Sequence, residues 1–197
     1  MEEPWEEVLR FWLGAPGSDP LANAARWFEV DAAFDAEIRA RFGGLVERGA
    51  GGALDAWRST ARGTLALVIL LDQFPRNLHR GSARAFEHDG AALALSLEAQ
   101  ARGLDRELGP VERWFLYLPL MHAEDAAFQA RCVALFDALA ADAPAALGEA
   151  LAGAADFARR HRAVIDRVGR FPHRNAALGR TTTREEAAFL EATGAGF

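Results

Sequence analysis

Lysine is absent from the 197 residues of this chain, so all 22 of its basic residues are arginine. This absence excludes a Schiff base on lysine and the phosphate-binding lysine of a P-loop. Because a bias in composition would place arginine at ordinary surface positions, an arginine is informative in this sequence only where its setting is unusual.

Cysteine is nearly absent, since Cys132 is the only one in the sequence. A single cysteine excludes an internal disulfide and any metal site built from several thiolates. In the stretch FQARCVALFDAL, Cys132 shares a helical face with Phe128, Phe136 and Leu139. We therefore expect a buried and unreactive thiol.

Long hydrophobic runs are also missing. The longest strongly apolar run, LALVILL at 65–71, is far too short to cross a bilayer. The chain begins with the acidic stretch MEEPWEEVLRF, where a signal peptide would be basic and then apolar. A formal net charge of −6, with acids interleaved among the arginines, disfavours a nucleic-acid partner. We expect a cytoplasmic protein with no membrane and no nucleic-acid partner.

Strand-like alternation is absent, and helical periodicity extends along nearly the whole sequence. The expected helices are residues 4–13, a segment capped by Asp31, a segment from Ser59 or Thr60 to Gln73, 88–102, 110–121, 123–140, 144–151, 154–168, and a short one after a capping box at Thr183. The stretches between them are too short for a domain linker. The sequence predicts one all-α domain over residues 1–197, with seven to nine helices in antiparallel pairs.

Two segments of similar composition, about a hundred residues apart, carry most of the unusual polar residues. We call DQFPRNLHRG (residues 72–81) the first Phe–Pro segment and GRFPHRNAALGR (residues 169–180) the second. In each, proline is expected to fix the chain as it leaves a helix and phenylalanine to fill the core, so that the following Arg and Asn are held rigidly. If the segments converge, they line a polar cleft suited to a small ligand.

Asp72 lies at the end of a helix that is apolar on all sides. A carboxylate there meets both a desolvation cost and the negative end of the helix dipole, so it requires a positive partner. Arg76, one turn further on, is the nearest candidate, and Arg170 and Arg174 are candidates from across the fold. A purely structural Asp–Arg clamp explains the pattern equally well.

Two histidines also interrupt apolar faces. His161 shares a helical face with Phe157 and Val164, so it is expected to point into the core, where a satisfied structural histidine is the commoner case. His122 would share a face with Asp125 if the helix were kinked at Pro119. A metal site from His122, Asp125 and His161 would be chemically reasonable, but nothing in the spacing requires it, so we predict no metal.

With these residues in view, the sequence resembles the bacterial family called domain of unknown function 924. The resemblance covers essentially the whole chain and is carried by LLDQFPRNLHRGSARAF, FLYLPLMHAED and RHRAVIDRVGRFPHRN, with VLRFWLG and NAARWF near the N-terminus. It implies an all-helical fold similar to tetratricopeptide-like right-handed superhelices, and it brings no activity. The positions that match the family's signatures are Asp72, Gln73, Arg76, Asn77, Arg80, His122, Glu124, His161, Arg170, His173, Arg174 and Asn175.

Three functions fit these residues. The first is a cleft that binds a small anion, a carboxylate or phosphate, through bidentate arginines, with acid–base catalysis as an open subset and no cofactor. Its catalytic candidates are Asp72, His122 and His161, and its ligand-binding candidates are Gln73, Arg76, Asn77, Glu124, Arg170, His173, Arg174 and Asn175. The second is a tetratricopeptide-like module for a protein partner. The third is purely structural. We rank the small-anion site first.

The structural alternative makes its own prediction. If Asp72 only clamps a helix end, Asp72→Asn should lower the free energy of unfolding by roughly 3–5 kcal/mol, because it breaks a buried ion pair. Urea unfolding measures this loss. A loss below about 1 kcal/mol, the scale of an exposed ion pair, would contradict the clamp.

Overall fold

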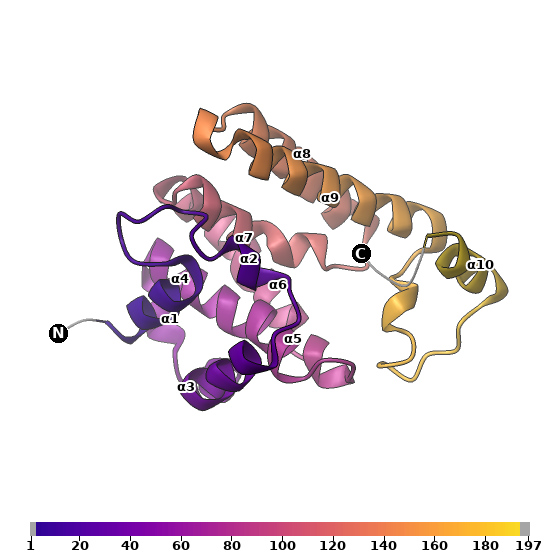
Figure 1. The fold of residues 1–197 in the computed structure, drawn as a ribbon, viewed down its shortest axis with the longest axis horizontal. Helices are drawn as coiled ribbons and strands as arrows, with labels where there is room; N and C mark the ends of the chain where they lie inside the picture. The colour runs from indigo at the N-terminus through magenta and orange to yellow at the C-terminus, as the bar shows by residue number, and fades with distance from the viewer. Residues whose placement is uncertain (1–2, 194–197) are drawn as a thin grey trace. The chain divides into compact units, whose positions relative to one another are not determined.

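The computed structural model describes residues 3–193, in which every regular element is helical (Figure 1). The α-helices are α1 (Pro4–Leu13), α2 (Ala24–Trp27), α3 (Ala32–Ala50), α4 (Ala61–Val68), α5 (Phe74–Leu78), α6 (Asp89–Ala101), α7 (Pro110–Met121), α8 (Ala126–Ala141), α9 (Gly148–Val168) and α10 (Arg184–Thr193). The all-α prediction is confirmed, whereas the tetratricopeptide-like superhelix stays a prediction. Over residues 3–193, none of the helices combines the length and the apolar character that a membrane span requires.

The chain divides into two compact units. The first contains the residues up to Arg80 together with Arg84–Pro119, and the second contains Gly81–Ala83 and the residues from Leu120 onward. The second boundary therefore falls inside α7, at its internal proline. The expectation of a single domain stays a prediction.

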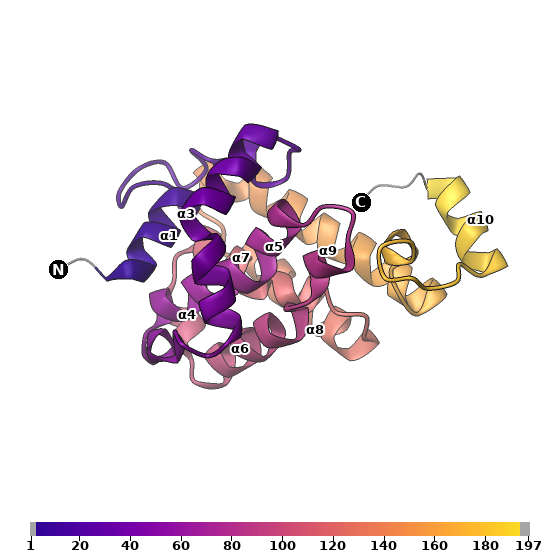
Figure 2. The same ribbon diagram turned by 90° about the horizontal axis from the view of Figure 1, so that it is seen from below.

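Aromatic side chains fill the centre of the first unit. Phe74 is fully buried, with its ring centroid 5.5 Å from that of Trp12 and 5.1 Å from that of Phe42. Phe11 stacks on Phe34 at 5.2 Å, so that α1 and α3 lie side by side (Figures 1 and 2). The phenylalanine of the first Phe–Pro segment fills the core as expected.

The first Phe–Pro segment does not leave its helix, and here the sequence prediction was wrong. The helix that begins at Ala61 passes through a π-helical turn at Ile69–Gln73 and continues as α5 to Leu78. In this turn the N–H of Phe74 donates to the carbonyl oxygen of Ile69, five residues back. The wider turn accommodates Pro75, which has no N–H and whose ring would collide with a carbonyl in a regular α-helix.

Three of the predicted helix starts are confirmed by their hydrogen bonds. The carboxylate of Asp31 accepts from the N–H groups of Ala33 and Phe34, and the hydroxyl of Thr60 accepts from Gly63 N–H. At α10, Thr183 N–H donates to Glu186 Oε2 at 2.7 Å while Glu186 N–H donates to Thr183 Oγ1 at 3.2 Å. These reciprocal bonds are the capping box that the sequence indicated.

In the second unit, α8 and α9 pack against each other as an antiparallel pair (Figure 1). Cys132 of α8 is fully buried, so the expectation of a buried thiol is confirmed, and burial raises its pKa to about 12, which favours low reactivity. The helices expected at 144–151 and 154–168 are instead one helix, α9. Gly153 does not interrupt it, because the alanines around it are strong helix formers.

A turn separates α7 from α8, so the expected kinked helix through Pro119 does not reach Asp125. α7 ends at Met121, His122 to Glu124 lie in the turn, and Asp125 is the N-cap of α8, where it accepts from Ala127 and Phe128 N–H groups. His122 and Asp125 therefore do not share a helical face. Within the described part of the chain, no group of three or more His, Cys, Asp or Glu side chains is arranged to hold a metal ion.

Close packing at Gly63 generates a stability prediction. A Cβ at this position would lie 2.3 Å from the carbonyl oxygen of Trp57 and 2.9 Å from Thr60 Oγ1. Gly63→Ala should therefore lower the free energy of unfolding by about 1–3 kcal/mol, since the backbone must move. Gly153→Ala is the matched control: its Cβ would meet nothing within 4 Å, and it should stabilise α9 by about 0.5–1 kcal/mol. Urea unfolding of both variants tests this, and equal effects would contradict it.

Candidate functional site

The second Phe–Pro segment begins where α9 ends. Gly169 adopts a left-handed conformation (φ 78°), and its N–H donates to Ile165 O at 2.9 Å, as expected for a helix stop. Phe171 follows and is fully buried in a cluster with Val164, Ile165 and Phe189. Residues Pro172–Arg174 then form a 3-10 turn. Here proline does leave the helix, as predicted.

Glu124 fixes this segment from the α7–α8 turn. Its Oε1 accepts from Phe171 N–H at 2.7 Å, and its two oxygens accept from Arg180 at 2.6 and 3.0 Å. Arg180 also donates to Phe171 O and to Asn175 Oδ1, both at 2.9 Å. Partial burial raises the pKa of Glu124, but the bonds from Arg180 and Phe171 N–H outweigh it, so the pKa is lowered. Glu124 is therefore a charged structural tie.

Glu186 of α10 ties down the other side of the segment. It is buried, pairs with the guanidinium of Arg170, and accepts from Asn175 Nδ2 at 3.2 Å. The bonds from Arg170 and from Thr183 N–H lower the pKa of Glu186 to about 2. Among the predicted ligand-binding residues, Glu124, Arg170 and Asn175 thus have structural partners within the second unit, which agrees with the clamp interpretation for these three.

Three histidines gather beside Phe171. His161 is 6% exposed and its ring centroid lies 5.4 Å from that of Phe171 and 6.5 Å from that of His122. The ring centroid of His173 lies 5.7 Å from that of Phe171. His161 points into the interior, as expected. The α7–α8 turn, α9 and the second Phe–Pro segment each contribute one histidine to this histidine cluster.

The protonation state of His161 follows from its surroundings. Burial, with help from the neighbouring His122 and the positive charge of Arg174, lowers its pKa to about 3, although a contact with Phe157 O opposes the shift. The ring is therefore neutral at pH 7. Its Nδ1 lies 3.0 Å from Phe157 O, and a carbonyl oxygen can only accept, so Nδ1 carries the proton. Nε2 is then the nitrogen that can accept a proton or a hydrogen bond.

Arg174 supplies the positive charge of the cluster. The residue is 7% exposed, and its Cζ lies 4.6 Å from the centroid of the Phe171 ring, which holds the guanidinium plane. Desolvation and the charge of Arg174 also lower the pKa of His173, to about 4. The surface of His173 is exposed to solvent, whereas His161 is buried. Burial therefore accounts for the neutral state of His161 more directly than for that of His173.

Gln129 holds the turn that carries His122. Its Nε2 donates to the carbonyl oxygens of Met121 at 2.7 Å and Ala123 at 2.8 Å, on either side of the histidine. Gln129 is fully buried, so the turn has a rigid support. The sequence analysis missed Gln129, as it missed Arg180 and Glu186. Of the three, only Glu186 had a local indication, as the last residue of the capping box.

The predicted residues of the first Phe–Pro segment form a separate network within the first unit. Asp72 is fully buried and accepts from Gln73 Nε2, and Arg76 Nη1 lies 3.4 Å from Asp72 Oδ1. Arg76 also forms a bidentate pair with Asp89, at 2.8 and 3.0 Å. Burial lowers the pKa of Arg76, but Asp72 and Asp89 outweigh it and the pKa is raised. The predicted Asp72–Arg76 pair is confirmed.

Asp35 holds the remainder of this segment. Asn77 Nδ2 donates to Asp35 Oδ1 at 2.8 Å, and Arg80 Nε donates to Asp35 Oδ2 at 2.7 Å. Asp35 and Asp89 were missed, because both are acidic residues in the first turn of a helix, a common feature that names no partner. The predicted site residues thus fall into two sets, one in each unit, and convergence of the two Phe–Pro segments stays a prediction.

Comparison with known proteins places the chain among proteins without an assigned activity. The family model described as "Bacterial protein of unknown function (DUF924)" matches residues 8–194. A solved structure of a protein of unknown function from Agrobacterium tumefaciens is similar to this chain at 38% sequence identity and a TM-score of 0.81, covering 95% of this chain and 97% of that one. No curated protein matches.

The neutral state of His161 predicts how stability depends on pH. The unfolded chain protonates this histidine below about pH 6.5, while the folded protein resists protonation down to about pH 3. Between these two pH values the free energy of unfolding falls by up to about 1.4 kcal/mol for each unit by which the pH falls. The total loss at pH 5 is about 2 kcal/mol. His161→Gln removes this term, so its urea-unfolding stability should fall less than that of the wild type between pH 7.5 and 5.

His88→Gln, which changes a histidine outside the cluster, is the control and should follow the wild type. Parallel stability curves for wild type and His161→Gln would show that His161 titrates normally in the folded protein.

Proposed function

This chain belongs to the bacterial family of proteins of unknown function that the DUF924 model describes, and because that description assigns no activity, we propose from its geometry that it binds a small anion at the histidine cluster. The observation that carries the proposal is the neutral, buried His161 beside Arg174. A buried positive charge next to a neutral imidazole creates a local potential that a carboxylate or phosphate would relieve.

Arg174 is the residue suited to contact the anion. Its guanidinium is held against Phe171, and a rigid fork recognises a carboxylate or phosphate through two parallel hydrogen bonds. Arg170 and Arg76, which the sequence placed beside it, are already paired with Glu186 and with Asp72 and Asp89. The proposed site is centred on Arg174 because its guanidinium lies against Phe171, within the histidine cluster.

His161 gives the proposed site a proton-linked property. A bound anion stabilises the imidazolium form and so raises the pKa of His161 above its value of about 3. Between the free and bound pKa values, binding takes up one proton, and affinity rises as the pH falls. A base with a pKa of about 3 is weak at neutral pH, so catalysis would require the bound ligand to bring the pKa closer to 7. We therefore propose anion binding, and acid–base catalysis stays an open possibility within that proposal.

A protein partner is the second candidate, and one feature of the first unit favours it. Phe28 is 59% exposed and Val30 is 81% exposed, in the connection between α2 and α3. The Phe28 ring stacks on that of Trp114 at 6.1 Å, which extends the apolar surface. Large exposed apolar residues in one place are typical of interaction surfaces. This surface shares no residue with the histidine cluster, so the two candidates can be tested separately.

Sulfate titration tests the proposed anion site, because sulfate keeps its charge across the pH range used. Isothermal titration calorimetry should show affinity rising by up to tenfold per pH unit as the pH falls between the bound and free pKa values of His161, with proton uptake. Arg174→Gln should abolish binding. His161→Gln should still bind sulfate, with its pH dependence reduced.

Arg160→Gln is the matched control, because Arg160 is an exposed arginine of α9 paired with Asp156. It should leave sulfate binding unchanged. Circular dichroism would establish that Arg174→Gln is folded. Binding that survives in folded Arg174→Gln, or that weakens equally in Arg160→Gln, would contradict the proposal.

A further inference from the structure

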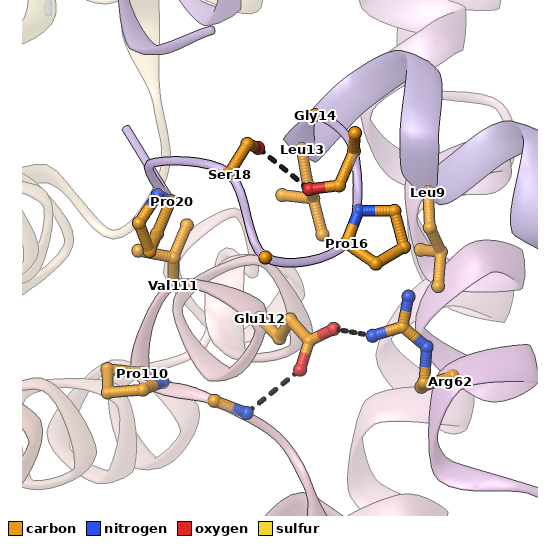
Figure 3. Close-up of a pocket in the computed structure, with 13 residues that line it drawn as sticks. Leu9, Leu13, Gly14, Pro16, Ser18, Pro20, Arg62, Pro110, Val111 and Glu112 are labelled. Atoms are coloured by element: carbon orange, nitrogen blue, oxygen red, sulfur yellow. Dashed lines mark hydrogen bonds and ion pairs between the residues drawn. The ribbon is translucent and has the colours of Figure 1, made fainter. Parts of the chain in front are cut away.

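The first unit contains a cavity of about 210 Å³ that shares no residue with either Phe–Pro segment or with the histidine cluster (Figure 3). Its walls come from the end of α1, the loop that follows it, the start of α4 and the start of α7. The lining residues are Leu9, Leu13, Gly14, Ala15, Pro16, Gly17, Ser18, Pro20, Arg62, Gly109, Pro110, Val111 and Glu112. Sites for drug-sized ligands are larger, about 300–1,000 Å³, so this cavity suits a smaller molecule.

The loop wall of the cavity is held in place by its own bonds. Gly14, at φ 101°, donates its N–H to Arg10 O at 3.0 Å, and a Cβ there would come within 2.9 Å of Ser18 Oγ. Ser18 Oγ donates to Ala15 O at 2.7 Å. Asn23 Nδ2 then donates to Trp12 O at 3.2 Å at the end of α1. A preformed wall lowers the entropic cost of binding.

The polar end of the cavity is Arg62, facing Glu112. Glu112 uses both of its oxygens: Oε1 pairs with Arg62 Nη1, and Oε2 accepts from Gly109 N–H at 2.8 Å. Among the residues that the structure describes, Arg62 hydrogen-bonds to Glu112 alone, through Nη1. Its N–H groups on Nε and Nη2 make no such bond. The side chain is 43% exposed, and Figure 3 shows one of its terminal nitrogens at Glu112 and the other turned toward Leu9 and Pro16. The cavity therefore offers donors next to an apolar wall.

We propose that this cavity binds a small monocarboxylate with a short apolar chain. The carboxylate of the ligand would accept hydrogen bonds from the N–H groups of Arg62 that do not bind Glu112. Charge-assisted bonds from a guanidinium are among the strongest available to a carboxylate. The chain would lie against Leu13 and Pro16, which line the cavity and keep part of their surface exposed. An alkylammonium ion is disfavoured, because both oxygens of Glu112 are already engaged by Arg62 and Gly109.

Butyrate is the probe, with butyramide and butylammonium as isosteric controls at an ionic strength kept constant with sodium chloride. Methyl NMR of the full chain should show saturable shifts of Leu9, Leu13 and Val111 with butyrate. Butyramide should bind about tenfold more weakly or worse, since it loses the charge-assisted bond. Arg62→Gln should weaken butyrate binding by about tenfold or more for the same reason.

Two further variants separate this site from other effects. Leu13→Phe narrows the cavity and leaves the Arg62–Glu112 pair intact, so it should weaken butyrate binding without loss of the fold. Arg174→Gln, which tests the histidine cluster, should leave the butyrate shifts unchanged. Absence of saturable shifts, equal binding of butylammonium, or unweakened binding by Arg62→Gln or Leu13→Phe would overturn the proposal.

Discussion

The Glu124–Arg180 pair is the constraint on which the second unit's polar arrangement depends. It joins the turn between α7 and α8 to the segment that follows α9, and it holds both the N–H and the carbonyl oxygen of Phe171. Phe171 in turn contacts the rings of His161 and His173 and supports Arg174. A carboxylate between two polypeptide segments thus holds the backbone of Phe171, against which His161, His173 and Arg174 lie.

The two Phe–Pro segments place the same residue types in similar surroundings with different backbone conformations. Both bury a phenylalanine and leave arginine and asparagine next to it in a fixed position. In the first, a π-helical turn lets the helix run on past Pro75. In the second, Gly169 in a left-handed conformation ends the helix before Pro172. Asp72 lies within the π-helical turn, whereas Gly169 at the matching position adopts the left-handed conformation that stops a helix, so similar sequences give different chain directions. The two Phe–Pro segments therefore share the way their phenylalanine is buried, and they do not share a backbone structure.

Local features of this fold could be predicted from the sequence, and pairings between distant residues could not. Caps at Asp31, Thr60 and Thr183 depend on neighbours within four residues, so their residue types suffice to find them. The partners of Arg80 and Arg170 lie 45 and 16 residues away. With 28 acidic residues for 22 arginines, composition alone cannot select among the pairs. Of the histidine cluster, only the inward direction of His161 could be predicted.

The most direct test of the proposed anion site is the pKa of His161 measured by NMR of its ring nitrogens, without added anion. A neutral ring with its proton on Nδ1 that persists from pH 7 down to pH 5 would support a buried imidazole beside a fixed positive charge. Protonation of His161 near pH 6.5, with exchange between the two tautomers, would contradict this description of the cluster.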